Sequence, residues 1–464
     1  MKKGDIRIGI NGVTYILQKR IGRGGQAEVW KVQDDHTKLY YAYKEYKQNT
    51  NDIRSNIEDL IKIGKLKDKN GNLLDSVVLP ITTVEGEGTA FGYIMELVDL
   101  QDFTIIKKAW AGHYPSCQAI CNIVRNLAQV FETLHLSYGM CYKDVNEGNI
   151  FFNPVTGQIK IIDNDNIGYR DKFTIKGTSG YMAPEVVLGD KPDHNSDRFS
   201  FSVFVYRLLI GGFPFEGPYT EQYCIKNNIL PDDARKVIYG TNALFVWHPI
   251  DRRNSIEHSG RPDHKGQVKF WNRLPVTVKD LFINTFATNL SKDRCAERAT
   301  DADWKDVFEK LEKNLVTCPK CGKITFSEAG ICFECGQQLR KRAVKTAEVS
   351  SAGGRIHKHK VIFKVLSRNR NKGTDKKEIS VYVADEITGE QISEHLPKGA
   401  LFKILYSKNI HKMGIQNLSA NSWVIVHPDR SRKECASGQI QALEKQMMIR
   451  IIPKIVQLNV VDIQ

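Results

Sequence analysis

The chain has 464 residues, which is too long for one ordinary hydrophobic core and predicts two or three domains. Lysine and arginine outnumber aspartate and glutamate by 67 to 53, a surplus that favours anionic partners such as nucleotides, nucleic acid or acidic protein surfaces. The opening MKKGDIRIGINGVTY has no apolar core of the signal-peptide type, and the most apolar later run, FSVFVYRLLIGGF, is short and interrupted by Arg207. We expect a soluble, cytoplasmic protein without a membrane partner, and ten cysteines in so long a chain do not form a disulfide scaffold.

Residues 9–98 carry a strand-rich pattern. The runs VTYILQKRIG, AEVWKVQ, YYAYKEY and FGYIMELV concentrate β-branched and aromatic residues between glycine, aspartate and asparagine. One interruption, NDIRSNIEDLIKIG, repeats isoleucine and leucine at helical spacing and predicts a helix that stops at Gly64. From about Ser116 the pattern becomes helical, so a small β-rich lobe precedes a larger helical lobe that extends to about residue 314.

Four of the cysteines form a compact unit at residues 315–338. Their order is C-x2-C, ten residues, C-x2-C, with a glycine after each pair: Cys318, Cys321, Cys332 and Cys335. Four thiolates at this spacing select Zn²⁺ in a closed structural site, because no coordination position stays open for catalysis. The alternatives are redox-active disulfides or free thiols.

Two further segments follow the cysteine unit. Residues 339–360 are rich in lysine and arginine and predict a flexible basic linker. From residue 361 to 464 the strand signal returns in VIFKVL, ISVYVAD, ALFKILY and SWVIVHP, as in a small sandwich or barrel. The string MGIQNLSANSWVIVHPD hints at a recognition domain, but the arginine and serine of a phosphopeptide reader cannot be placed, and a structural or docking domain is the better interpretation.

Polar residues gather around a short predicted hairpin in the helical lobe. CYKDVNEGNIFF places Asp144 and Asn149 five positions apart, and the β-rich run after them ends in IKIIDNDN with Asp163. Two carboxylates and a carboxamide can hold Mg²⁺ on a triphosphate while orienting a hydroxyl, because Mg²⁺ takes hard oxygen ligands.

Further motifs occur in a fixed order around this hairpin: IGRGGQAEVW (21–30), YAYKEY, YIMELVD, YKDVNEGN, IIDNDN and GTSGYMAPE (177–185). With them, residues 9 to about 314 resemble a eukaryotic-type (Hanks-type) protein kinase, as found also in bacteria. The resemblance implies an α+β, bilobal kinase fold with a β-rich N-lobe and a helical C-lobe. It also implies ATP and Mg²⁺ as cofactors, and transfer of the γ-phosphate to serine or threonine hydroxyls of protein substrates, including autophosphorylation.

The resemblance assigns a nucleotide site to the N-lobe. Gly22 and Gly24 would approach the phosphates, although the third glycine of the loop is replaced, and Val29 would pack on the base. Ala42 would lie against adenine. Lys44 would hold the α- and β-phosphates.

The same resemblance gives Lys44 a partner. Glu58 of the predicted helix is the candidate, with an exposed helix acid as its alternative interpretation. Met95 stands at the gatekeeper position, and the backbone from Glu96 to Val98 would face adenine.

In the C-lobe, Asp144 would accept or orient the proton of the substrate hydroxyl. Asn149 and Asp163 would ligate Mg²⁺. Asp197 matches the helix aspartate that braces the catalytic loop.

The end of the activation segment carries further matches. Arg298 would pair with Glu185 of the A-P-E string. Thr174, Thr178 and Ser179 are the candidate phosphosites, but Thr178 is better interpreted as the structural threonine near the catalytic aspartate.

Several positions depart from the family pattern. Tyr142 and Lys143 replace its His and Arg, and Asn146 replaces the lysine of serine/threonine kinases, which weakens the assignment of hydroxyl specificity. Asn164 and Asp165 replace the Phe and Gly of D-F-G, so the Phe-driven switch cannot work in its usual form. Asp165 is open to two interpretations, a second acidic ligand or a turn cap.

These observations predict five segments: N-lobe 9–98, C-lobe 99–314, zinc ribbon 315–338, basic linker 339–360 and an all-β domain 361–464. The first functional hypothesis is an active kinase. The second is a pseudokinase, a nucleotide-binding scaffold that presents the ribbon and the β-module to partners. A third, a zinc-ribbon nucleic-acid binder, lacks an aromatic-interleaved motif. The chain also looks like bacterial family members from systems that pair a kinase with a phosphatase and a von Willebrand-type protein.

Overall fold

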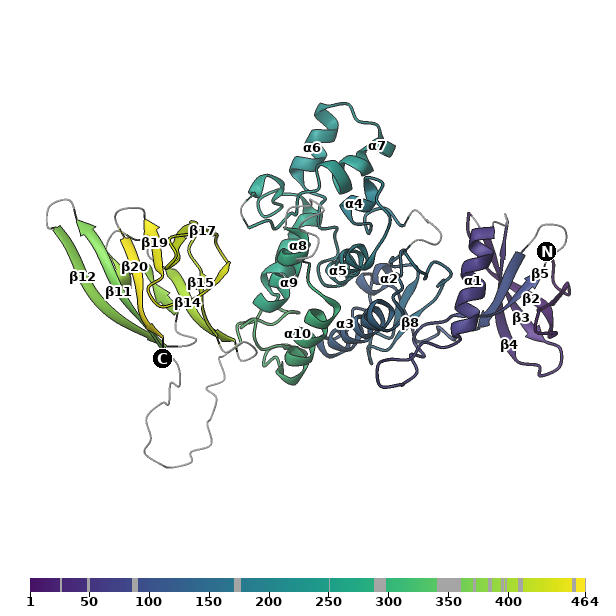
Figure 1. Ribbon diagram of the computed structural model, residues 1–464. Coiled ribbons are helices and arrows are strands. Elements are labelled where there is room, and N and C mark those ends of the chain that lie inside the picture. The colour runs from purple at the N-terminus through teal and green to yellow at the C-terminus, as the bar shows by residue number, and fades with distance from the viewer. Residues whose placement is uncertain are drawn as a thin grey trace. The chain divides into compact units, whose positions relative to one another are not determined.

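The computed structural model describes residues 1–25, 27–47, 51–85, 91–170, 177–249, 251–287, 298–339, 360–369, 373–382, 386–393, 396, 399–407, 412–452 and 456–463. The chain divides into two compact units, residues 1–343 and 344–464, and each is described by itself (Figure 1). The predicted basic linker lies outside the described residues except at its two ends. None of the helices in the described ranges is long and apolar enough to cross a bilayer.

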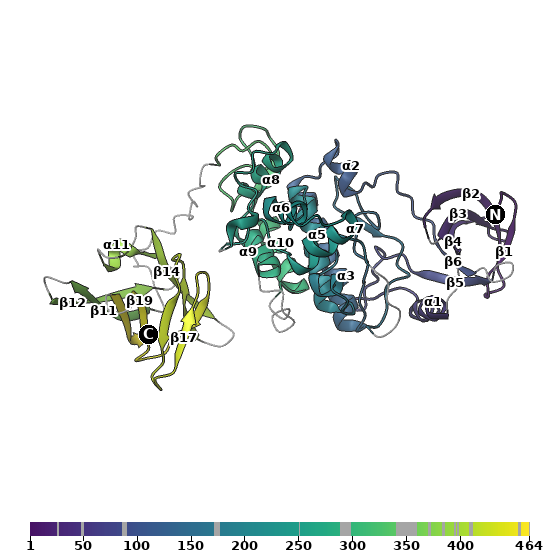
Figure 2. The same cartoon turned by 90° about the horizontal axis from the view of Figure 1, so that it is seen from above.

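The first unit begins with a six-stranded antiparallel sheet in the order β1-β2-β3-β4-β6-β5 (Figure 2). Its strands are β1 (Ile6–Ile8), β2 (Thr14–Arg23), β3 (Ala27–Asp34), β4 (Tyr40–Tyr46), β5 (Pro80–Glu85) and β6 (Phe91–Glu96). A bridge between Gly9 and Val84 joins the chain after β1 to β5, so the sheet curls toward closure. The strand-rich N-lobe that the sequence predicts is therefore present.

One helix packs on this sheet. Helix α1 (Asn51–Ile63) covers β5 and contributes Ile57 to a core shared with β4 and β6. The helix ends where the sequence predicts, because Gly64 adopts a left-handed φ of 68° and its N–H bonds back to Leu60 and Ile61.

The C-lobe is built around helices whose apolar stripes meet in one core. Helix α5 (His194–Ile210) is buried along most of its length and lies at the centre, with a capping box at Asp193 and a left-handed C-cap at Gly211. The other elements are α2 (Ile106–Trp110), α3 (Cys117–Glu132), η1 (Thr133–Ser137), β7 (Ile150–Phe152), β8 (Ile159–Ile161), α4 (Pro184–Val187), α6 (Pro218–Lys226), α7 (Pro231–Lys236), η2 (Val237–Thr241), η3 (Arg252–Asn254), α8 (Pro262–Asn272), α9 (Val276–Phe286) and α10 (Asp301–Lys313).

The cysteine unit, residues 315–338, shares the C-lobe core rather than standing apart from it. Its hairpin pairs β9 (Leu315–Thr317) with β10 (Ile324–Phe326). The Phe333 ring lies 5.2 Å from that of Phe270 and 6.3 Å from that of Tyr114. Arg273 donates from Nη1 to the carbonyl oxygens of Phe333 at 3.0 Å and Glu334 at 2.6 Å. The unit is thus attached to α8 and its neighbours by both apolar and polar contacts.

The second unit consists of two antiparallel sheets, in the orders β12-β11-β20-β19-β16-β17 and β13-β14-β15-β18. Phe363 and Trp423 of one sheet contact Phe402 of the other, so both sheets share a single core. The elements are β11 (Lys360–Asn369), β12 (Gly373–Tyr382), β13 (Glu386–Thr388), α11 (Gly389–Ile392), β14 (Ala400–Ser407), β15 (Lys412–Asn417), β16 (Trp423–Val426), β17 (Arg432–Cys435), β18 (Ile440–Ala442), β19 (Met448–Ile452) and β20 (Val456–Ile463).

The NLSANSW string in this unit forms a buried polar network. The fully buried Asn417 side chain donates to the carbonyl oxygens of Asn421 at 2.8 Å and Cys435 at 3.0 Å. Its Oδ1 accepts from Ser419 N and Oγ, and Trp423 Nε1 donates to Ser419 Oγ at 3.0 Å. The string therefore fixes the connection between β15 and β16, which is a structural role.

Replacing Asn417 with alanine will destabilise the second unit by about 2–3 kcal/mol, because it removes the buried hydrogen bonds of this side chain to two backbone carbonyls and to the Ser419 N–H. Hydrogen exchange of residues 412–426 in the full chain measures this as lost protection. The control is Asn421→Ala, whose side chain is exposed. Equal protection in the two variants would contradict the structural role of the network.

Candidate active site

Lys44 forms ion pairs that connect the two lobes. It lies in β4 and is 8% exposed. Its Nζ forms an ion pair with Asp163 and a second one with Asp165 Oδ2 at 2.6 Å, both from the loop after β8. Burial opposes the charge on Lys44, but the two carboxylates outweigh it and raise the Lys44 pKa.

The two carboxylates have different surroundings. The Asp163 side chain is 43% exposed, whereas that of Asp165 is 6% exposed and also accepts a hydrogen bond from Tyr46 Oη. Asp163 adopts a positive φ of 62°, an uncommon conformation outside glycine that functional loops often hold. Desolvation and the negative charge of Asp165 raise the pKa of Asp163, and Lys44 lowers it. A site with this surplus of carboxylate oxygen suits a hard cation.

The catalytic-loop residues lie beside these carboxylates. Asp144 Oδ1 accepts from Thr178 N at 2.9 Å and from Thr178 Oγ1 at 2.7 Å, which confirms the structural role predicted for this threonine. Asn149 donates from Nδ2 to the Asp144 carbonyl at 3.4 Å, and its own carbonyl accepts from Ile162 N at 2.9 Å. These contacts bring Asp144, Asn149 and Asp163 together. Of the candidate phosphosites, Thr174 lies outside the described residues.

A buried aspartate supports the loop from below. Asp197 of α5 accepts from the backbone N–H of Tyr142 at 2.6 Å and of Lys143 at 2.9 Å. His135 lies between Asp197 at 3.2 Å and Asp301 at 2.8 Å. Burial alone would lower the pKa of His135, but hydrogen bonds and charge from both aspartates raise it to about 9.

A second brace holds the end of the activation segment. Arg298 donates from Nη1 and Nη2 to the two carboxylate oxygens of Glu185 at 2.6 and 2.9 Å, and from Nη1 to the carbonyl of Asn195 at 3.0 Å. This fork geometry is the strong form of an ion pair, and it confirms the predicted pairing of Arg298 with Glu185.

The N-lobe supplies an apolar wall near Lys44. Val29, Ala42, Met95 and Val98 belong to one hydrophobic cluster together with Ile162 from the C-lobe. Ala42 lies directly opposite Met95 across β4 and β6. These are the residues expected to enclose adenine, and Glu96 ends β6 beside them.

The glycine-rich turn between β2 and β3 is bonded to the residue that follows β4. Gly22 lies opposite Val29 across β2 and β3, and the N–H of Gly24 donates to the Ala27 carbonyl at 2.9 Å. Lys47 Nζ donates to the carbonyl oxygens of Gly24 at 2.8 Å and Gly25 at 3.0 Å, so the turn is held against the end of β4.

Comparison with known families agrees with this arrangement. The family model for the protein kinase domain matches residues 15–304. The chain belongs to the protein kinase domain family.

Several curated kinases are similar to this kinase domain. Serine/threonine-protein kinase PknA of Mycobacterium tuberculosis is 27% identical over 222 residues, which are 44% of this chain and 50% of the relative. Mitogen-activated protein kinase kinase 2 of Arabidopsis thaliana is 27% identical over 256 residues, 48% of this chain and 67% of the relative. Ribosomal protein S6 kinase 2 alpha of Xenopus laevis is 26% identical over 280 residues, 56% of this chain and 37% of the relative. The chain thus spans half the length of the mycobacterial kinase.

The predicted partnership of Lys44 with Glu58 is not what the structure has, because Lys44 pairs with Asp163 and Asp165 instead. The helix face that meets the active-site loop carries Asn56, which donates from Nδ2 to the carbonyl oxygens of Asp165 at 2.7 Å and Ile167 at 2.9 Å. Residues two positions apart in a helix point to opposite sides, so Glu58 faces away from Lys44 when Asn56 faces the loop.

The departures from the kinase motifs have visible structural roles. Tyr142 is buried and packs 5.6 Å from Phe131, and Lys143 donates from Nζ to the Tyr169 carbonyl at 2.8 Å. Asn164 is buried in place of the usual Phe and donates to the carbonyl oxygens of Val78 at 2.8 Å and Ile161 at 2.7 Å. Hydrogen bonds therefore fix the loop where the family uses apolar packing.

Two residues of the site, Tyr46 and Asn56, were missed by the sequence analysis. Tyr46 follows Lys44 by two positions in a strand, so alternation places both side chains on the same face and could have revealed it. For Asn56 the available signal was a polar residue beside the apolar stripe of α1, which by itself predicts only a solvated position.

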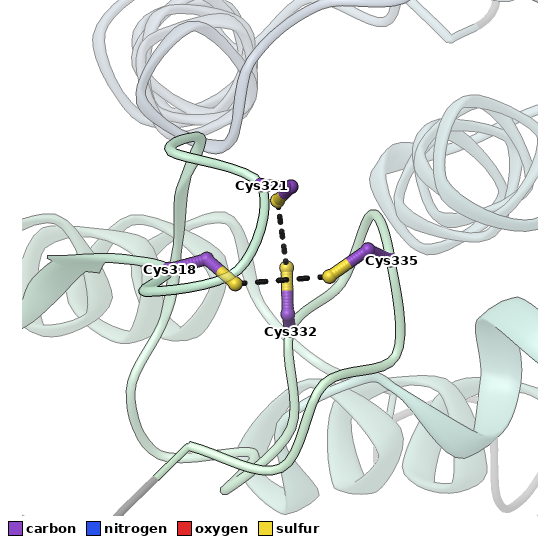
Figure 3. Close-up of side chains that lie close together, drawn as sticks. All are labelled: Cys318, Cys321, Cys332 and Cys335. Atoms are coloured by element: carbon purple, nitrogen blue, oxygen red, sulfur yellow. Dashed lines mark hydrogen bonds between the residues drawn. The ribbon is translucent and has the colours of Figure 1, made fainter.

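The four predicted cysteines converge in the cysteine unit (Figure 3). Their Sγ atoms all lie within 4.8 Å of one another, with 3.7 Å between Cys318 and Cys335 and 3.8 Å between Cys321 and Cys332. A tetrahedral Zn²⁺ with bonds of about 2.3 Å requires sulfur separations of about 3.8 Å. Each pair is followed by a left-handed glycine whose N–H donates to the first cysteine's carbonyl at 2.9 Å.

The His135 brace predicts a pH dependence. The pKa of His135 is raised to about 9 from an unfolded value near 6.5, so its contribution to stability is complete below about pH 6.5 and is lost as the pH rises through about 9. The melting temperature of the kinase unit will fall over this range, and His135→Gln will flatten the fall relative to the exposed control His258→Gln. Identical pH profiles of the two variants would contradict the brace.

Proposed function

We propose that the chain is a Mg²⁺-dependent protein kinase that transfers the γ-phosphate of ATP to serine or threonine hydroxyls of protein substrates, its own chain included. The observation that carries the proposal is the convergence of Lys44, Asp144, Asn149 and Asp163 at the junction of the lobes. The similar proteins include a serine/threonine-protein kinase, which supports the substrate class.

Each residue has a definite task in this reaction. Asp144 takes the proton of the attacking hydroxyl as its oxygen forms a bond to the γ-phosphorus, the bond from that phosphorus to the β-phosphate oxygen breaks, and ADP leaves. Lys44 binds the α- and β-phosphates, while Asn149 and Asp163 would hold Mg²⁺, which neutralises charge on the phosphates when bound. The apolar wall of Val29, Ala42 and Val98 is suited to adenine.

The complete set of polar residues argues against the pseudokinase alternative. A scaffold needs neither a buried lysine paired with carboxylates nor an exposed carboxylate beside Asn149. Of the residues that depart from the family pattern, Lys143 and Asn164 form hydrogen bonds to backbone carbonyls. The hypothesis of a nucleic-acid binder is weakened because one face of the cysteine unit is covered by the C-lobe. Phe333 packs on Phe270 there, and Arg273 donates to the Phe333 carbonyl.

The cysteine cluster supports a second proposal, in which Cys318, Cys321, Cys332 and Cys335 hold a structural Zn²⁺ as a zinc ribbon. The sulfur separations and the paired glycine turns fit this ion. We also propose the segment boundaries given by the sequence and a cytoplasmic location. A cognate phosphatase or a von Willebrand-type partner stays a prediction from the family resemblance.

Asp144→Asn and Asp163→Asn will each lower phosphate incorporation from labelled ATP by roughly 10³-fold, because one removes the proton acceptor and the other a metal ligand. The assay uses Mg²⁺ with the full chain and a basic protein, and locates the phosphate on serine or threonine. Asp306→Asn, an exposed acid on α10, is the control and keeps full activity. Incorporation that survives both active-site substitutions would contradict the proposal.

Cys332→Ser will remove the bound zinc and lower the melting temperature of the kinase unit by about 5 °C or more, since the neighbouring Phe333 packs in the C-lobe core. Metal analysis and thermal unfolding of the full chain measure both effects. The control is Cys435→Ser, which is expected to keep the zinc content because Cys435 lies outside the cluster. A fully stable wild-type chain that contains no zinc would contradict the zinc proposal.

A further inference from the structure

Asp165 occupies the position where the kinase motif has glycine, and it is the more buried of the two carboxylates at Lys44. Its side chain is 6% exposed. Oδ2 lies 2.6 Å from Lys44 Nζ and also accepts from Tyr46 Oη. A buried carboxylate without partners would be costly, and here a lysine and a phenol from the same face of β4 satisfy it.

Helix α1 acts on this group through Asn56. Asn56 is 2% exposed and donates to the carbonyl oxygens of Asp165 and Ile167, so it fixes the loop that carries the carboxylate. The contact is close: a Cβ atom at Gly168 would lie 2.3 Å from Asn56 Oδ1, so a larger residue there would displace the Asn56 side chain. The helix therefore acts on Lys44 indirectly, and not through an acid of its own. Asn56 holds the backbone of the loop, and Asp165 of that loop pairs with Lys44.

The exposures of the two carboxylates indicate separate tasks. Asp163 faces outward, where a metal ion on the nucleotide phosphates would draw it away from Lys44. Asp165 faces inward, where Tyr46 donates to its carboxylate and Asn56 donates to its backbone carbonyl. Burial beside Asp165 raises the pKa of Tyr46, so its phenol stays protonated as a donor.

We propose that Asp165 is a positioning residue that holds Lys44 for the nucleotide phosphates, in place of an acid on helix α1. This rests on the proposed kinase function, because it names the residue that prepares the phosphate-binding lysine. Tyr46 and Asn56 are its supports, one at the carboxylate and one at the backbone.

The test compares Asp165→Asn, Asp165→Gly and Glu58→Gln in the full chain. The dissociation constant of a fluorescent ATP analogue with Mg²⁺ is measured first, and KM for ATP and kcat second. We expect both Asp165 variants to bind the analogue about ten-fold more weakly or worse, with a raised KM for ATP, because each leaves the buried ammonium with one carboxylate that Mg²⁺ also needs. Glu58→Gln is expected to match the wild type.

The glycine variant makes the test sharp, since it restores the residue of the family motif. Wild-type affinity in Asp165→Gly, or a loss in Glu58→Gln as large as in Asp165→Asn, would overturn the proposal. If the Asp165 variants do not fold, as judged by circular dichroism, Tyr46→Phe decides: about a three-fold weaker affinity supports the proposal, because one neutral hydrogen bond is removed, and unchanged affinity overturns it.

The affinity readout separates this proposal from the proposed function. A wild-type chain that binds the analogue but transfers no phosphate would refute the kinase activity, and the comparison of affinities would still decide the role of Asp165. A wild-type chain that binds no nucleotide would refute both.

Discussion

The buried ammonium group of Lys44 is the constraint on which the two-lobed site depends. A lysine with 8% of its surface exposed is stable as a cation only if carboxylates lie beside it. The N-lobe strand that carries Lys44 has none in contact, so Asp163 and Asp165 are supplied by the loop after β8 in the other lobe. The electrostatic requirement of one side chain thus joins the lobes where phosphates and metal would bind.

The rest of the C-lobe keeps that loop and its neighbour in place. Asp197 holds the backbone before Asp144, His135 and Asp301 hold Asp197, and the Arg298–Glu185 pair fixes the segment that ends at α4. All these groups are buried or nearly so, where hydrogen bonds to charged groups are strong and a missing partner is costly. The cysteine unit extends the same core, so metal binding there would also support the kinase fold.

Much of this could be predicted from the sequence, because motif order constrains a fold more than any single residue does. The strand-rich lobe, the helix Asn51–Ile63 and the meeting of four cysteines follow from residue patterns and spacing. The Arg298–Glu185 pair follows from the family resemblance. The residue through which helix α1 supports Lys44 could not be predicted in this way. Spacing indicates that an acid lies near the helix stripe, but only the rotation of α1 decides whether residue 56 or residue 58 faces the loop, and packing against residues 165–168 sets that rotation.

The most direct test of the central claim is a structure of the full chain with Mg²⁺ and a non-hydrolysable ATP analogue. The account predicts that Lys44 Nζ stays within about 3 Å of Asp165 while Asp163 turns to the metal together with Asn149. A complex in which α1 rotates to bring Glu58 onto Lys44, with Asp165 released into solvent, would contradict it.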